Sequence, residues 1–303
     1  MNDVSLLSVS FGNRAFIDCN VELTESLNAV KPSNWLVINN GDDGDKIHTI
    51  HHSYMTPVMG IPKAGRYAQG SYHHAAALNL GLGLVKTRFL VVLDHDFYII
   101  QQNWIQRVLE HMINHDLSFF GAPWNPFWNL HYRDFPAVHF MAIDLDRVDQ
   151  SQIDFTPGFL NDWKWSILRF TPFQFGQFRD TGYSVARRFT RSPEHLTDLL
   201  IPHYKPPLMF NKATEIYCRL TQSFQKGMPE GMCALPKKTG YYTDKSFLEQ
   251  YACEASNERW EEFFWFDQPF AFHLRQVGRR NFRTVSEAAD LEKLKSIVRF
   301  HTL

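Results

Sequence analysis

The segment Phe89–Phe97 (FLVVLDHDF) combines the pattern of a buried strand with two closely spaced carboxylates. Five apolar residues lead directly into Asp94-His95-Asp96. An unbroken apolar run is typical of a strand buried on both faces, and open α/β sheets bind ligands at the carboxyl ends of such strands. Residues i and i+2 of an extended segment share a side, so both carboxylates can face one ligand. They suit a divalent cation that holds phosphate oxygens; the alternative is a turn after a strand, where Asp is common.

The segments around this motif alternate between strand and helix patterns. The predicted strands are Leu6–Val9, Trp35–Ile38, Phe89–Leu93 and Leu117–Gly121, and the predicted helices are Phe16–Val30, Gly70–Val85 and Trp104–Met112. Alternation of this kind is typical of a parallel sheet with right-handed crossover connections. We therefore predict an α/β fold with a mostly parallel sheet flanked by helices.

Residues 123–303 have a more irregular pattern. The stretch 123–180 is rich in Trp, Phe, Pro and Asn. The elements predicted here are a strand at Val138–Ile143 and helices after Asp180, near Ala213–Phe224 and over Ser286–Phe300. No repeat, low-complexity tract or clear linker divides the chain, so we predict one domain over residues 1–303.

The composition narrows the classes of partner. The formal net charge is -1, which gives no basic excess for nucleic acid and no polybasic segment for anionic lipid. The four cysteines form no CxxC pair, which favours free thiols in a reducing compartment. The N-terminal segment lacks the pattern of a signal peptide, and no apolar run approaches the ~18 residues of a membrane span. The expected location is cytoplasmic, without a transmembrane segment.

Three motifs, taken in order, resemble family 2 glycosyltransferases of the GT-A fold. Ile38–Gly44 (INNGDDG) lies where that family has an Asp-rich loop, Gly70–Gly81 resembles its G-x-x-x-A-x-N-x-G helix, and Leu90–Asp96 (LVVLDHD) resembles its D-x-D strand. The resemblance covers residues 5–97 and then weakens. It implies a GT-A-like (Rossmann-like) fold, with a nucleotide-sugar-binding half at 1–122 and an acceptor-binding and catalytic half at 123–303.

The resemblance also implies an activity. A metal-dependent, inverting enzyme of this family moves a sugar from a nucleotide-sugar donor to a hydroxyl of a saccharide or other acceptor. The Q-x-x-R-W motif of processive members is not met near Gln276, so a non-processive enzyme is expected. Mn²⁺ or Mg²⁺ would neutralise the leaving diphosphate. Asp96 is the expected metal ligand, and Asp94 would hold the ribose or a metal-bound water.

Further site residues follow from the same resemblance. His273, at the end of an apolar run, matches the additional metal ligand that many GT-A enzymes take from near the C-terminus; the alternative is a hydrogen-bonded core histidine. Near it in the sequence, Arg275, Arg279 and Arg280 could meet diphosphate oxygens through bidentate contacts. The alternative for all three is a solvated basic face, which is favoured for Arg280. The nucleoside base is expected near Ser10, Phe11 and Asn39, with Asp42 or Asp43 as alternatives to Asn39.

The acceptor side offers a candidate general base. Phe178–Arg187 (FRDTGYSVAR) resembles the family's ED-type motif, with Arg179 in place of the first acid. Asp180 would accept the proton of the acceptor hydroxyl, or cap a helix, or both. Asp162 is the reserve candidate. Aromatic residues such as Trp124 and Trp128 either line an acceptor cleft or fill the core.

Two other functions remain open at this level. A nucleotidyltransferase also uses acids at strand ends and a metal, but Ser10–Arg14 is poor in the glycines that such an enzyme needs. A non-catalytic carbohydrate-binding protein on a transferase fold is the second alternative. The presence of both Asp94 and Asp96 argues against it, whereas Arg179 and Asn39 leave it open. The histidines clustered over residues 48–74 fit a structural role better than a zinc site.

Overall fold

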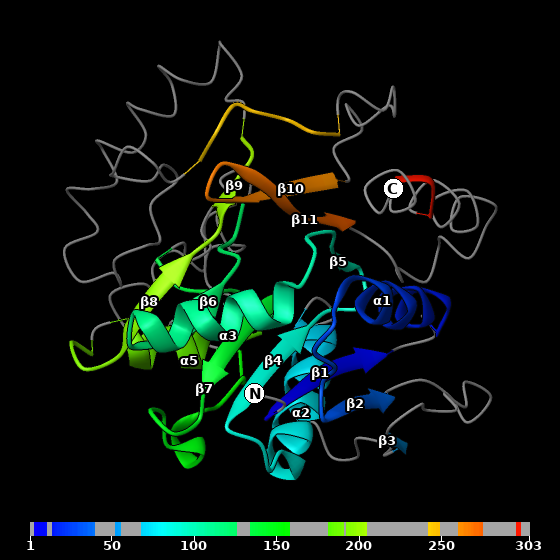
Figure 1. The fold of residues 1–303 in the computed structure, drawn as a ribbon. Helices are drawn as coiled ribbons and strands as arrows, with labels where there is room; N and C mark the ends of the chain where they lie inside the picture. The colour runs from blue at the N-terminus through cyan, green and yellow to red at the C-terminus, as the bar shows by residue number, and fades with distance from the viewer. Residues whose placement is uncertain are drawn as a thin grey trace, which may run out of the picture.

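A computed structural model gives the arrangement of the chain as two sheets with helices (Figure 1). The structure describes residues 3–10, 14–39, 52–55, 68–125, 134–157, 181–190, 192–204, 242–248, 260–274 and 295–297. Within these ranges, no helix is both long enough and apolar enough to cross a bilayer.

The larger sheet has seven strands in the order β3-β2-β1-β4-β7-β6-β8. Its strands are β1 (Val4–Ser10), β2 (Asn34–Asn39), β3 (His52–Met55), β4 (Phe89–Leu93), β6 (Leu117–Gly121), β7 (Phe140–Asp144) and β8 (Leu196–Leu199). β7 runs antiparallel to both neighbours, and the other pairs are parallel. The prediction of a mostly parallel α/β sheet is confirmed, although β7 was not expected between β4 and β6.

Helices cover both faces of this sheet (Figure 1). The helical elements are α1 (Arg14–Leu27), α2 (Ala68–Leu84), α3 (Trp104–Asn114), the 3-10 turn η1 (Gln150–Gln152) and α5 (Tyr183–Phe189). Successive residues of a strand point to opposite faces. Leu6 of β1 accordingly packs in a core with α1 and α3, whereas Leu7 packs with α2 and α5. The side chains of β4 point alternately into these two cores, and for this reason its whole apolar run is buried.

A smaller sheet continues from the end of β4. It contains β5 (Phe97–Ile99), β9 (Ile201–Pro202), β10 (Trp260–Trp265) and β11 (Gln268–Leu274), in the order β5-β11-β10-β9. One face packs against the core under α1 and α3, through residues such as Phe97 and Phe263. The opposite face packs against the outer side of α1, through Tyr98 and Phe272. Because β5 begins directly after Asp96, this sheet is fixed to the carboxyl end of β4.

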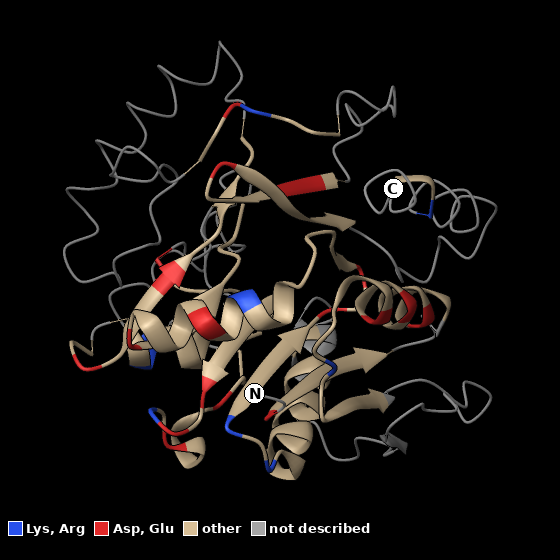
Figure 2. Cartoon of the chain, viewed as in Figure 1, with Lys and Arg blue, Asp and Glu red and all other residues tan. Residues whose placement is uncertain are grey.

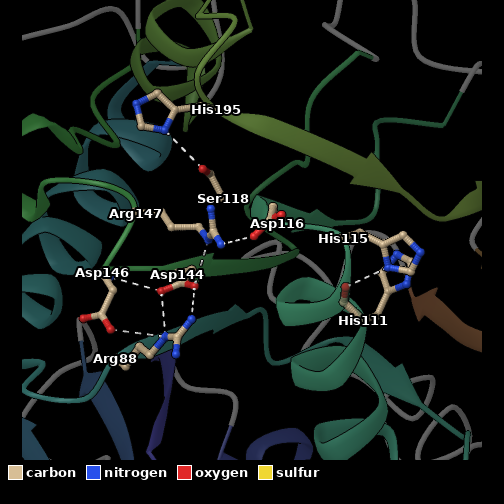
Figure 3. Close-up of polar contacts among 9 residues, drawn as sticks. All are labelled: Arg88, His111, His115, Asp116, Ser118, Asp144, Asp146, Arg147 and His195. Atoms are coloured by element: carbon tan, nitrogen blue, oxygen red, sulfur yellow. Dashed lines mark hydrogen bonds and ion pairs between the residues drawn. The ribbon is translucent and has the colours of Figure 1, made fainter.

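The opposite end of β4 is closed by an ion-pair network, drawn in Figure 3. Arg88 Nη2 lies 2.7 Å from Asp144 Oδ2, and Arg88 Nε lies 3.1 Å from Asp144 Oδ1. Asp144 is fully buried, and Arg147 lies 3.5 Å from it through Nε. Arg147 also contacts Asp116. A bidentate guanidinium therefore compensates the buried carboxylate at the end of β7.

Two predicted helices fall largely outside the described residues. The segment Ala213–Phe224 lies outside them entirely. Of Ser286–Phe300, only 295–297 are described, and they are helical.

Candidate active site

The D-x-D segment and the end of β11 meet at the carboxyl edge of the larger sheet. β11 pairs with β5 so that His273 lies opposite Phe97. The backbone N–H of Leu274 donates to the carbonyl of Asp96 at 2.8 Å. This pairing brings Asp94, Asp96 and His273 together, with one ligand atom from each lying within 4.8 Å of the others. The three residues that the sequence assigned to a metal are thus neighbours in space.

Asp96 and His273 form a buried ion pair. His273 Nε2 lies 3.3 Å from Asp96 Oδ1, and His95 Nε2 lies 3.9 Å from Asp96 Oδ2. Burial alone would raise the pKa of Asp96, but the charges of His95 and His273 outweigh it and lower that pKa to about 2. Burial alone would lower the pKa of His273, but Asp96, followed by Glu261, raises it to about 9. Each group therefore favours the charged form of the other.

Asp94 is more accessible than Asp96 and has a different neighbour. Its Oδ1 lies 3.3 Å from Nε2 of His74 on α2. The turn that carries both carboxylates is held by backbone contacts. The N–H of Asp94 donates to the His139 carbonyl at 3.0 Å, and Asn20 Nδ2 donates to the His95 carbonyl at 3.1 Å. The turn is thus held by the residue that precedes β7 on one side and by α1 on the other.

Two buried side chains that the sequence analysis did not select contact His273. Glu261 Oε2 on β10 lies 3.1 Å from His273 Nδ1. The ring of His139 stacks on that of His273, with 4.8 Å between centroids. Trp124 is buried and lies edge-on to His139, so it packs in the core. The acidic pair inside the aromatic run Trp260–Trp265 is the sequence signal that could have found Glu261.

The expected nucleotide side lies at the same sheet edge. Ser10 and Asn39 are the last residues of β1 and β2, and they are paired in register. Ser10 is buried, and its Oγ has no hydrogen-bond partner among the described residues. Three predicted site residues lie outside the described residues: Phe11, Asp180 and Arg275. The same holds for the alternatives and secondary candidates Asp42, Asp43, Trp128, Asp162, Arg179, Arg279 and Arg280.

The donor set fits a divalent cation. Within the described part of the chain, Asp94, Asp96 and His273 form the single group of acidic, His or Cys residues whose geometry could hold a metal ion. Carboxylate oxygens suit Mg²⁺ and Mn²⁺, and an imidazole nitrogen moves the preference toward Mn²⁺ and other transition metals. With Nε2 deprotonated, His273 can supply a ligand beside two carboxylates.

Comparison with known proteins identifies the family of this chain. The family model described as Glycosyl transferase family 2 matches residues 21–180, which is more than half of the chain. The chain therefore belongs to this family, and the class of protein is a glycosyltransferase. A search of curated proteins finds no match.

Several solved structures resemble the chain. One is the mannosyltransferase PcManGT from Pyrobaculum calidifontis in complex with GDP-Man and Mn²⁺, with 10% identity and a TM-score of 0.41, over 76% of this chain and 67% of that one. Another is S. aureus TarS, with 11% identity and a TM-score of 0.36, over 50% of this chain and 30% of that one. TarS 1-349 in complex with UDP-GlcNAc has 11% identity and a TM-score of 0.33, over 50% of this chain and 48% of that one. The match spans less than half of either TarS chain.

Proposed function

We propose that this glycosyltransferase is metal-dependent, transfers a sugar from a nucleotide-sugar donor to an acceptor hydroxyl, inverts the anomeric centre and is non-processive. The observation that carries the metal dependence is the cluster of Asp94, Asp96 and His273 at the carboxyl edge of the sheet. Family membership supports the transfer of a sugar. Inversion and the lack of processivity rest on the family resemblance and on the absence of a Q-x-x-R-W motif.

The described residues divide the work on the donor. Asp96 and His273 would hold Mn²⁺ or Mg²⁺ directly, and Asp94 would hold the cation through water or contact the ribose. When bound, the cation neutralises the charge that develops on the diphosphate leaving group. Ser10 and Asn39 stand at the ends of the neighbouring strands, where they would meet the nucleoside base together with Phe11. Arg275, which follows β11, would contact diphosphate oxygens.

Asp180 is the proposed base for the acceptor hydroxyl. The next residue, Thr181, donates through Oγ1 to the carbonyl of Ser71 at 3.1 Å. Ser71 lies on α2, one helical turn before His74, which contacts Asp94. This contact joins Thr181, the residue that follows Asp180 in the sequence, to the helix that carries His74. Asp180→Asn should keep metal and nucleotide binding and lose sugar transfer, and normal turnover would assign the base elsewhere.

The organisation and location of the chain are also part of the proposal. We infer a single domain with a donor half at 1–122 and an acceptor half at 123–303. A cytoplasmic location is supported by Cys19, which is buried and outside any disulfide. Burial, followed by Glu22, raises the pKa of the Cys19 thiol to about 11, so this thiol is poorly reactive.

A thermal-shift experiment tests the metal assignment. Mn²⁺ with UDP or GDP should raise the melting temperature by about 5 °C at a hundredfold excess over Kd. Asp96→Ala should remove this gain, because the cation loses a charged ligand. Equal stabilisation of the two proteins would refute the assignment. Stabilisation without hydrolysis or transfer across a panel of nucleotide sugars would favour a non-catalytic carbohydrate-binding protein.

A further inference from the structure

The acidic segment of β10, visible in Figure 2, contains two adjacent glutamates with different partners. Glu261 lies directly opposite His273 in the antiparallel pair of β10 and β11. Glu262 lies opposite Phe272, on the other face of the sheet. Both side chains are buried, with 6% and 5% exposure. Their surroundings must therefore supply hydrogen bonds, because an unpaired buried carboxylate is costly.

Glu262 has a structural environment. Its Oε1 accepts from Ser246 Oγ at 2.7 Å, and its Oε2 accepts from the backbone N–H groups of Phe247 at 2.6 Å and Leu248 at 3.1 Å. These contacts attach the segment 242–248 to β10. They lie on the face opposite the cluster of Asp94, Asp96 and His273.

Glu261 faces the candidate metal ligand instead. Its Oε2 lies 3.1 Å from His273 Nδ1. A carboxylate can only accept in this contact, so Nδ1 must carry the hydrogen and donate it. The other ring nitrogen, Nε2, then points to Asp96 at 3.3 Å. The contact with Glu261 therefore selects the tautomer in which Nε2 can offer a lone pair to a cation.

The plane of the His273 ring is restrained separately. The His139 ring stacks on it with 25° between planes, and the Phe97 ring lies 5.8 Å away. Stacking limits the tilt of the imidazole, whereas the hydrogen bond to Glu261 limits its rotation about χ2. Together these contacts leave one orientation, with Nε2 toward the two aspartates.

We propose that Glu261 is a positioning residue, which holds the His273 imidazole so that Nε2 can bind the divalent cation. The inference rests on the proposed metal-dependent function and adds a residue that acts through His273 without touching the cation. A carboxylate hydrogen-bonded to the far nitrogen of a ligating histidine fixes its orientation and raises its basicity. The register of β10 and β11 supplies this contact.

The experiment measures Mn²⁺ binding to the full chain by electron paramagnetic resonance. Free Mn²⁺ gives the affinity, and electron spin echo modulation detects a directly bound ¹⁴N nucleus. Glu261→Met removes the acceptor while keeping most of the volume, and it should weaken Mn²⁺ binding about 10- to 100-fold and diminish the ¹⁴N signal. Glu261→Gln offers an amide oxygen to Nδ1 and should remain within about threefold of the parent chain.

The matched control is Glu262→Gln, on the same strand with similar burial. It should lower thermal stability, because segment 242–248 loses a charged acceptor, and leave the Mn²⁺ affinity unchanged. Parent-like affinity and ¹⁴N signal in Glu261→Met would overturn the inference, as would a Gln variant as weak as the Met variant. Should Glu261→Met fail to fold, Glu261→Ala is judged by the same two readouts. A parent chain without Mn²⁺ binding or ¹⁴N coupling would instead refute the proposed function.

Discussion

The two ends of the β4–β7 pair both carry carboxylates, but their partners differ in kind. At one end, buried Asp144 accepts two hydrogen bonds from Arg88, and Arg147 lies beside it. At the other end, Asp94 and Asp96 have imidazoles as their ion-pair partners among the described residues. Both arrangements balance negative charge next to the same strands.

The two kinds of partner, guanidinium and imidazole, differ in whether they can lose a proton. A guanidinium stays protonated and has no lone pair to give, and Asp144 raises the pKa of Arg88 further above its already high value. An imidazole can lose its proton and then act as a ligand itself. The Arg88 end is therefore closed by a permanent cation, whereas the His273 end can exchange a proton for a metal ion. The ability of the partner to lose a proton therefore distinguishes a cluster that only stabilises the fold from one that could bind a metal ion. Burial distinguishes them less clearly, because both clusters contain buried carboxylates.

Replacing His273 by Arg should have the largest effect on activity. The substitution puts a permanently charged guanidinium, like that of Arg88 at the opposite end of β4, into the candidate site. The guanidinium can pair with Asp96 but cannot coordinate a metal. Sugar transfer should fall about 1000-fold, on the order of 4 kcal/mol, and Mn²⁺ should no longer raise the melting temperature. His115→Arg, at an exposed position, is the control and should behave like the parent chain. If Mn²⁺ still stabilised His273→Arg, the imidazole of His273 would not be needed as a metal ligand.

Arg88→Met should have the next largest effect, on folding alone. It leaves the fully buried Asp144 without its bidentate partner. The free energy of unfolding should drop by about 3 kcal/mol in urea titrations. The Mn²⁺-induced stabilisation should persist, since the proposed metal ligands lie at the other end of β4. Arg107→Met, which removes an exposed guanidinium stacked on Trp265, should cost at most about 1 kcal/mol. A cost no larger for Arg88→Met would mean that Asp144 needs no permanent cation.

The smallest expected effect is a pH dependence of stability in the presence of a chelator. The pKa of His273 is about 9 in the fold against an ordinary value of 6.5, so its pairing with Asp96 and Glu261 stabilises the fold fully below pH 6.5. This contribution should be lost as the pH rises from 6.5 through 9. Urea unfolding at pH 6, 7.5 and 9 should show a steeper decline for the parent than for His273→Gln. If stability declined equally with pH in the two proteins, folding would not raise the pKa of His273.

The sequence located the elements whose signal is local. The apolar runs Phe89–Leu93 and Leu117–Gly121 predicted β4 and β6 with the bounds that the structure has. The insertion of β7 between them could not be predicted, because a hydrophobic run specifies burial and leaves the pairing partner open. The three-residue strand β5 is too short to give a period, and the small sheet therefore escaped prediction.

The same limit applies to the candidate site. The spacing of Asp94 and Asp96 places both acids in one short turn, which is a local property. The sequence predicted an extended segment here, whereas the Phe97 N–H donates to the Asp94 carbonyl and closes a turn. The proximity of His273 was inferred from the family resemblance, and the pairing of β5 with β11 explains it. Glu261 stands out in the sequence as an acid inside an aromatic run, but its contact with His273 could not be predicted, because the register of β10 and β11 brings the two residues together. That register includes a shift in β10 between Phe263 and Phe264, and such a shift has no periodic signature.

The wide separation along the chain of the residues in the proposed metal site has a consequence for biosynthesis. A nascent polypeptide that has left the ribosome as far as β7 already displays Asp94 and Asp96, but it lacks the imidazole on β11 and the strand that orients it. Loop closure must bring β11 to β5 before the third ligand arrives, and contacts of such long range form slowly. An unfinished translation product that ends before β11 therefore holds the two acids without the third residue of the proposed cation site.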